Sequence, residues 1–226
     1  PGEVYITRTL ATYSYELNNK KAPFDNVNIR KALNLSLDRN VITDKVLGQG
    51  QTPTYVFTPT YIEEGHLIQQ PAYSKEPMAQ RNEEAIKLLE EAGYSKANPL
   101  KFTILYNTNE NHKKVAIAAA SMWKANTKGL IDVKLENQEW KTYIDSRRAG
   151  RYDAARAGWN ADYNQATTFG NYFLSNSSNN TAKYANPEYD KAIAESYVAT
   201  DAEGRAKAYA KAEEILAKDF GIVPIF

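Results

Sequence analysis

The stretch ARAGWNADYN, residues 155–164, places a cation, a large aromatic ring and an anion three residues apart. These residues are Arg156, Trp159 and Asp162, and Gly158 precedes the tryptophan. A guanidinium can hold a carboxylate, and an aspartate can hold an ammonium group. Opposite charges that are set apart along one segment therefore match the two ends of a zwitterionic ligand.

An extended conformation over residues 152–158 would put Arg156 and Gly158 on one face of a strand. Gly158 and the alanine before it are too small to block approach to the backbone. A second extended chain could then pair with this segment as an added strand, with its side chains in pockets beside Trp159. One alternative stays open, a turn of small residues with a local pair between Arg156 and Asp162 and a tryptophan in the core.

Three further residues lie where predicted strands end. His112 opens a helix after the strand LKFTILYN, either as an exposed first-turn residue or as a cation or donor for an anionic ligand group. Trp140 ends the next strand and belongs either to the core or to a pocket wall. Arg147 follows beside Arg148 on a short helix, where a solvated charge pair is the default interpretation.

Metal and nucleophile chemistry have little support in this sequence. The chain has no cysteine, and its two histidines, His66 and His112, stand in unrelated contexts without a metal-ligand spacing. The stretch GQGQT at 48–52 lacks the lysine and hydroxyl residue that end a phosphate-binding loop. We therefore expect no cofactor, no metal and no enzymatic activity.

Charge and hydropathy exclude two further classes of protein. The 226 residues include 28 basic and 27 acidic side chains, so no overall field would attract a nucleic acid. No apolar run approaches the roughly 20 residues that a membrane-spanning helix needs. We expect a soluble chain of one large domain or two small ones.

The sequence predicts an α/β fold, because strands and helices alternate in its middle part. The three strands of this part are expected at residues 100–107, 131–140 and 151–159. A β-α-β-α-β order implies neighbouring parallel strands with right-handed crossovers. Ligands of such sheets sit beyond the carboxyl ends of the strands, which here are residues 107–112, 138–140 and 158–164.

The rest of the chain supplies edge strands and helical cover. A half-buried strand is expected within residues 4–19, and the final residues GIVPIF also resemble a buried strand. Helices are expected at residues 25–37, 41–47, 85–92, 187–199 and 202–219. The segments at 48–78 and 175–181 are expected to be irregular, the second as a solvated loop.

Four long stretches resemble one known family: ATYSYELNNKKAPFDNVNIRKALNLSLDRNVI, RNEEAIKLLEEAGYS, NQEWKTYIDSRRAGRYDAARAGWNADYN and LSNSSNNTAKYANPEYD. They closely resemble the carboxyl-terminal lobe of the bacterial periplasmic oligopeptide-binding proteins, the receptors of peptide importers of the ATP-binding-cassette (ABC) class. The resemblance covers essentially the whole chain. It implies a lobe of the type II periplasmic-binding-protein fold, a mixed, mostly parallel sheet with helices on both faces.

The resemblance also implies roles for matching residues in binding an extended peptide. Asp162 looks like the partner of the peptide's α-ammonium group. The cations that would serve peptide carboxylates are Arg156, Arg147 and His112. The pocket walls would be Trp159 and Trp140, and the main chain that pairs with the peptide would be that of Gly158 and Asn160.

The resemblance further implies that the chain is a piece of a longer, two-lobe receptor. Residues 1–22 would be hinge-proximal strands, and residues 23–226 the carboxyl-terminal ligand-binding lobe, without the amino-terminal lobe and a carboxyl-terminal return segment. The expected partners are short peptides, the other lobe and the membrane permease of an ABC importer. We expect a monomer in the periplasm, or a lipid-anchored one outside a Gram-positive cell.

Two other hypotheses stay open. A receptor of the same fold could instead bind dipeptides, murein peptides or metal chelates. A protein of another class, a chaperone-like binder of unfolded segments, could use the same extended backbone pairing. A peptidase would need a nucleophile or a metal centre, and the sequence offers neither.

Overall fold

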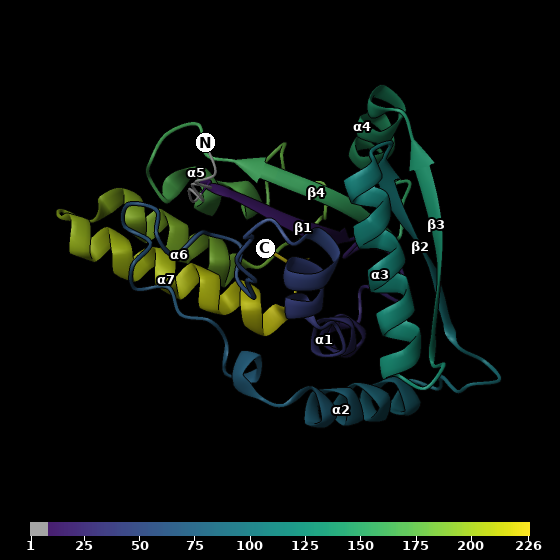
Figure 1. The fold of residues 1–226 in the computed structure, drawn as a ribbon. Helices are drawn as coiled ribbons and strands as arrows, with labels where there is room; N and C mark the ends of the chain where they lie inside the picture. The colour runs from purple at the N-terminus through teal and green to yellow at the C-terminus, as the bar shows by residue number, and fades with distance from the viewer. Residues whose placement is uncertain (1–8) are drawn as a thin grey trace, which may run out of the picture.

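The computed structural model describes residues 9–226, within which five strands form one mixed sheet in the order β3-β2-β4-β1-β5 (Figure 1). The strands are β1 (Ala11–Leu17), β2 (Leu100–Asn107), β3 (Ile131–Gln138), β4 (Ala154–Asn160) and β5 (Ile222–Pro224). β2 runs parallel to β3 and β4, whereas β1 is antiparallel to β4 and β5. The predicted mixed α/β sheet is confirmed, and the part of the first expected strand before residue 9 lies outside the described residues.

The helices cover both faces of this sheet. They are α1 (Val27–Leu35), α2 (Met78–Glu91), α3 (Glu110–Asn126), α4 (Trp140–Arg148), α5 (Thr167–Gly170), α6 (Pro187–Val198) and α7 (Ala202–Asp219), with a π-helix at Val41–Leu47 and 3₁₀ turns at Ala72–Lys75 and Asn171–Phe173. The predicted alternation of strands and helices is confirmed. Several boundaries differ from the predicted ones. Trp140 begins α4 and does not end β3, α2 begins seven residues earlier than expected, and β4 begins at Ala154.

The larger core lies between the sheet and α1, α2 and α3. Alternate residues of β1 and β2, such as Tyr15 and Ile104, point into it because successive side chains of a strand face opposite sides. Trp123 of α3 is fully buried there, and its Nε1 donates to the carbonyl of Leu33 at 2.9 Å. This bond ties α3 to α1 across the core.

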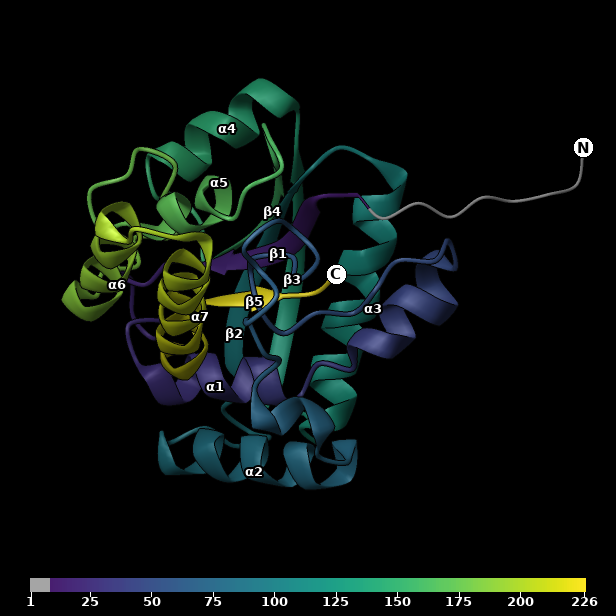
Figure 2. The same cartoon turned by 90° about the vertical axis from the view of Figure 1, so that its left-hand side faces the viewer.

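A second core lies on the opposite face, under α5, α6 and α7. The last two helices pack side by side (Figure 2), and their buried residues include Ile193 and Leu216. Glu213 of α7 accepts from the main-chain N–H groups of Phe57 and Thr58. The expected irregular segment after residue 48 is therefore bound to the body of the protein and does not project from it.

The Asn/Ser-rich loop at 175–181 corrects an expectation. Its first residues are exposed, but Asn180 and Thr181 are buried. The Asn180 amide donates to the carbonyls of Leu174 and Tyr184 at 3.1 and 2.7 Å. The prediction of a solvated loop is wrong for these two residues, whose polar side chains satisfy internal groups.

Gly93, the residue after the helix expected at 85–92, follows the end of α2 in the left-handed region at a φ of 94°. A Cβ at this position would meet no heavy atom within 4 Å. Gly93→Ala should therefore lower the free energy of unfolding by about 1 kcal/mol through backbone strain alone. Urea unfolding of this chain measures the loss, and Gly93→Asn, which tolerates this conformation, should lose less. Equal stability of the alanine variant and the wild type would contradict this explanation.

Candidate functional site

The outward edge of β4 lacks a neighbouring strand over most of its length. β2 pairs with β4 only at Ala154 and Ala155, and then leaves it. β1, on the other side, pairs with β4 along all seven residues. From residue 156 to 160, β4 thus has a ladder partner within the described chain on one side only.

The register shows which backbone groups of β4 face outward. Tyr13 of β1 donates its N–H to the carbonyl of Phe226 at 2.7 Å and accepts from the N–H of Ile225 at 2.9 Å, so its groups point away from β4. Tyr13 lies opposite Gly158, which must then direct its own groups away from β1. By the two-residue alternation of a strand, Asn160 does the same.

Gly158 and Asn160 are both exposed, and their main-chain groups have no partner within residues 9–226. An unpaired row of donors and acceptors on a sheet edge is a template for another strand. The predicted strand and its accessible backbone are therefore present in the structure. This edge is the geometric centre of the candidate site.

Gly158 also makes room for the chain's own arginine. A Cβ at this position would lie 2.6 Å from Nη2 of Arg156, whose side chain extends over the same face. The guanidinium lies 5.1 Å from the ring centroid of Tyr13, and its Nη1 donates to Asn107 Oδ1 at 3.3 Å. The glycine thus lets the cation lie flat along the strand.

Arg156 and Asp162 do not pair with each other. The structure gives Arg156 no carboxylate partner within the described chain, although its side chain is half-buried. Asp162 is exposed just beyond the end of β4 and likewise has no ion pair in this part of the chain. The alternative of a local Arg–Asp pair is therefore wrong, and both charges are open to a ligand.

His112 lies beside Arg156 and is held by two contacts. Asn109 caps α3 and accepts from the N–H of His112 at 3.1 Å. The imidazole Nδ1 lies 3.0 Å from the hydroxyl of Tyr13. Burial, and after it the charge of Arg156, lower the pKa of His112 to about 4.

The pKa values of His112 and Tyr13 determine whether His112 meets a ligand as a cation or as a neutral hydrogen-bonding group. Burial raises the pKa of Tyr13 above its ordinary value, although Arg156 opposes the shift, so the phenol keeps its proton. The direction of the bond between this hydroxyl and Nδ1 depends on the tautomer of His112, and the neutral ring has one N–H donor in either tautomer. At neutral pH His112 is a hydrogen-bond donor and not the cation expected from the resemblance.

Arg147 is buried, so its interpretation as a solvated residue is wrong. Its Nη2 donates to Glu16 Oε1 at 3.1 Å and to the hydroxyl oxygens of Tyr172 and Thr181 at 3.3 and 3.2 Å. Burial has the largest single effect on the pKa of Arg147 and would lower it, but the Glu16 carboxylate together with Tyr143 and Tyr172 raises it. Its charge is thus compensated internally, unlike that of Arg156.

The two tryptophans occupy different surroundings. Trp140 is 60% exposed, with its ring 5.6 Å from that of Tyr143, so the interpretation as a core residue is wrong. Trp159 is half-buried on the face opposite Arg156. Its Nε1 donates to the carbonyl of Thr168 at 2.8 Å, and its ring meets Tyr172 edge-on. Trp140 is therefore accessible to a ligand, and Trp159 is held by its hydrogen bond.

Three residues of this site were missed by sequence reasoning: Tyr13, Asn107 and Tyr143. The sequence indicates Tyr13 only as part of the strand expected within residues 4–19, and Asn107 only as the end of the strand expected at 100–107. Tyr143 carried no signal beyond its place on a short helix. Their roles depend on contacts between segments that are far apart in the sequence.

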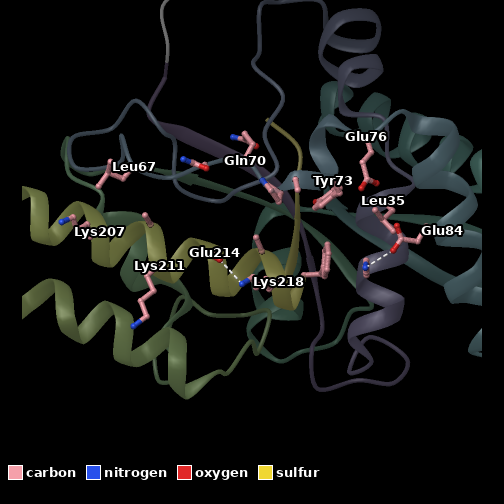
Figure 3. Close-up of a pocket in the computed structure, with 17 residues that line it drawn as sticks. Leu35, Leu67, Gln70, Tyr73, Glu76, Glu84, Lys207, Lys211, Glu214 and Lys218 are labelled. Atoms are coloured by element: carbon pink, nitrogen blue, oxygen red, sulfur yellow. Dashed lines mark ion pairs between the residues drawn. The ribbon is translucent and has the colours of Figure 1, made fainter.

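A cavity of about 950 Å³ lies elsewhere, between α1, α7 and residues 67–76 (Figure 3). Two of its lysines are neutralised within it, Lys31 by Glu84 at 3.0 Å and Lys218 by Glu214 at 2.9 Å. Within residues 9–226 no group of acidic and histidine side chains is arranged to hold a metal, and no helix is long and apolar enough to span a bilayer.

Comparison with known proteins gives a consistent result. The sequence model described as "Bacterial extracellular solute-binding proteins, family 5 Middle" matches residues 2–181. The periplasmic oligopeptide-binding protein OppA of Haemophilus influenzae is 96% identical over all 226 residues, and that of Salmonella typhimurium is 51% identical. The murein peptide-binding protein MppA of Escherichia coli is 43% identical over the same length.

The solved structures agree with the sequence matches. The crystal structure of Haemophilus influenzae OppA in complex with RPPGFSPFR has a TM-score of 0.98 at 96% identity, over 100% of this chain and 44% of that one. Unliganded MppA has a TM-score of 0.93 at 43% identity, over 100% and 43%. The chain spans 41–42% of the length of the curated relatives named above.

The low pKa of His112 leads to a prediction on pH dependence. In NMR titration of this chain, the His112 ring should titrate near pH 4, and Arg156→Gln should raise that midpoint by removing a neighbouring positive charge. An unfolded histidine titrates near 6.5, so the unfolded state binds more protons between these two pH values. Stability should therefore rise with pH from about 4 to about 6.5. A wild-type midpoint near 6.5 would contradict the burial of the ring.

Proposed function

Because the chain belongs to family 5 of the bacterial extracellular solute-binding proteins, we propose that it is the ligand-binding lobe of a receptor that captures short peptides in extended conformation and delivers them to an ABC transporter. The observation that carries this proposal is the free edge at Gly158 and Asn160, with Arg156 on one side and Asp162 on the other. Solute-binding proteins act by binding, and the chain is not an enzyme.

Backbone pairing explains how one receptor could accept many peptides. Main-chain hydrogen bonds are indifferent to side-chain identity, so pairing with Gly158 and Asn160 would give affinity without sequence preference. Asp162 would hold the α-ammonium group. Arg156 would hold the carboxylate, with His112 as a neutral donor beside it, and these charges would set the direction of the peptide.

The aromatic residues would form walls for the peptide side chains. Trp140 is exposed at the start of α4, where it could cover a side chain of the ligand. Trp159 would close the opposite side from its fixed position. Arg147 keeps its place among the predicted peptide contacts only as a secondary one, because Glu16 already neutralises it.

We further propose that residues 1–22 are the hinge-proximal part, from which β1 joins the sheet of the lobe formed by residues 23–226, and that the receptor's other lobe closes over the β4 edge. Expected partners are that lobe and a membrane permease. The matched relatives from Haemophilus, Salmonella and Escherichia are periplasmic by name, which supports the periplasm as the location. An oligopeptide is favoured over a dipeptide or a murein peptide, because the 96% identical protein was crystallised with the nonapeptide RPPGFSPFR.

The ammonium role of Asp162 can be tested in the full-length receptor. Asp162→Ala should weaken binding of trialanine by about 10- to 150-fold, since a charge-assisted bond contributes about 1.5–3 kcal/mol. N-acetyl-trialanine has no ammonium group, and its affinity should change less than threefold. Isothermal titration calorimetry measures both peptides.

Asp132→Ala is the matched control for this variant. Asp132 has no ion pair within residues 9–226 and lies at the amino end of β3, far along the sheet from the site, so its loss should leave both affinities unchanged. Equal losses for the free and the acetylated peptide with Asp162→Ala would remove Asp162 from the proposed contacts.

A further inference from the structure

The hydroxyl of Tyr143 occupies one position on the outward edge of β4. It donates to the carbonyl of Arg156, two residues before Gly158 along the strand. By the alternation of the strand, this carbonyl faces outward like those of Gly158 and Asn160. Without Tyr143 it would be a further acceptor for an added strand, so the open part of the edge begins after it.

Arg147 determines the orientation of this hydroxyl. Its Nη1 lies 3.4 Å from the Tyr143 oxygen, and a guanidinium can only donate. The tyrosine oxygen therefore accepts from Arg147, and its own proton is left for the Arg156 carbonyl. Glu16, buried in β1, holds Arg147 in turn at 3.1 Å.

The ring of Tyr143 packs on the sheet where β2 and β4 separate. It is fully buried in a cluster with Leu105 and Ala155, the last two residues that pair across these strands. This packing fixes the ring, and the hydroxyl reaches the first carbonyl of β4 beyond the paired part. The side chain thus takes up this position of the edge with its hydrogen bond.

We propose that Tyr143 is a positioning residue that ends main-chain pairing with a bound peptide at Gly158. This inference rests on the proposed function. A peptide with its ammonium at Asp162 and its carboxyl end toward Arg156 runs antiparallel to β4. It pairs with Asn160 and then Gly158, and it leaves the edge before the Arg156 carbonyl, so residues further along the peptide bind without backbone pairing to β4.

A scan of peptide amides tests where pairing ends. Pentaalanine with a single N-methyl group at each amide in turn is titrated into the full-length receptor by calorimetry. Methylation of the amide that pairs with Gly158 should weaken binding about tenfold, since one hydrogen bond is lost. Methylation two residues nearer the peptide's carboxyl end should change the affinity less than twofold. Equal losses at these two positions would overturn the inference.

Tyr143→Phe keeps the ring and removes the donor. The Arg156 carbonyl is then available to the peptide, so methylation of the amide two residues beyond the partner of Gly158, which changes the wild-type affinity less than twofold, should weaken binding to this variant about tenfold. Tyr189→Phe is the matched control, since it removes a buried hydroxyl bond to the carbonyl of Gly170, at 2.6 Å and away from β4. It should lower thermal stability without changing affinity.

The outcomes separate this inference from the proposed function. The wild-type methylation pattern in Tyr143→Phe, or the same change of pattern in Tyr189→Phe, would overturn the positioning role while the receptor still binds peptide. No binding of pentaalanine by the wild type would contradict the proposed function, and the inference with it.

Discussion

The separation of β2 from β4 after Ala155 is the constraint on which the site depends. Backbone groups that lose a strand partner need another one, from a side chain, from water or from a ligand. The chain satisfies the Arg156 carbonyl with Tyr143 and leaves the groups of Gly158 and Asn160 open. If β2 paired with β4 for five more residues, the backbone N–H and C=O groups of β4 would be hydrogen-bonded within the sheet. No free edge would then remain for a ligand.

The charged side chains near this edge follow the same pattern as its backbone groups: some are paired within the protein, and one is left without a partner in the described chain. Arg147 and Glu16 neutralise each other in the interior, where an unpaired charge would be costly, and their pair supports the hydroxyl that ends the edge. Arg156 is half-buried over Tyr13 and Gly158 without a carboxylate partner in the described chain. Arg147 is thus neutralised by a carboxylate of the chain itself. Arg156, at the edge, has no such partner in the described chain and can bind the carboxylate of a ligand.

Much of this arrangement could be predicted from local patterns. The two-residue period of a strand placed Arg156 and Gly158 on one face, and the β-α-β order placed the strand ends at one side of the sheet. The positive φ of Gly93 agrees with its predicted place after a helix. Each of these features depends on residues that are near one another in the sequence.

The predictions that were wrong share one physical cause: they concern residues whose surroundings depend on contacts between distant parts of the sequence. Arg147 of α4 was expected to be solvated because its partner, Glu16, lies 131 residues away in the sequence, on β1. The buried state of Asn180 and Thr181 depends on carbonyls and on a carboxylate that only the folded chain brings near. The neutral state of His112 follows from burial beside Arg156, which no spacing could indicate.

Backbone amide exchange at Gly158 and Asn160 tests the central claim most directly. In the full-length receptor, measured by NMR with and without saturating trialanine, the peptide should slow exchange of both amides at least tenfold. The Ala157 amide, which faces β1, should be protected in both states. Unchanged exchange at Gly158 and Asn160 in the peptide-saturated receptor would contradict the claim that a ligand binds as an added strand.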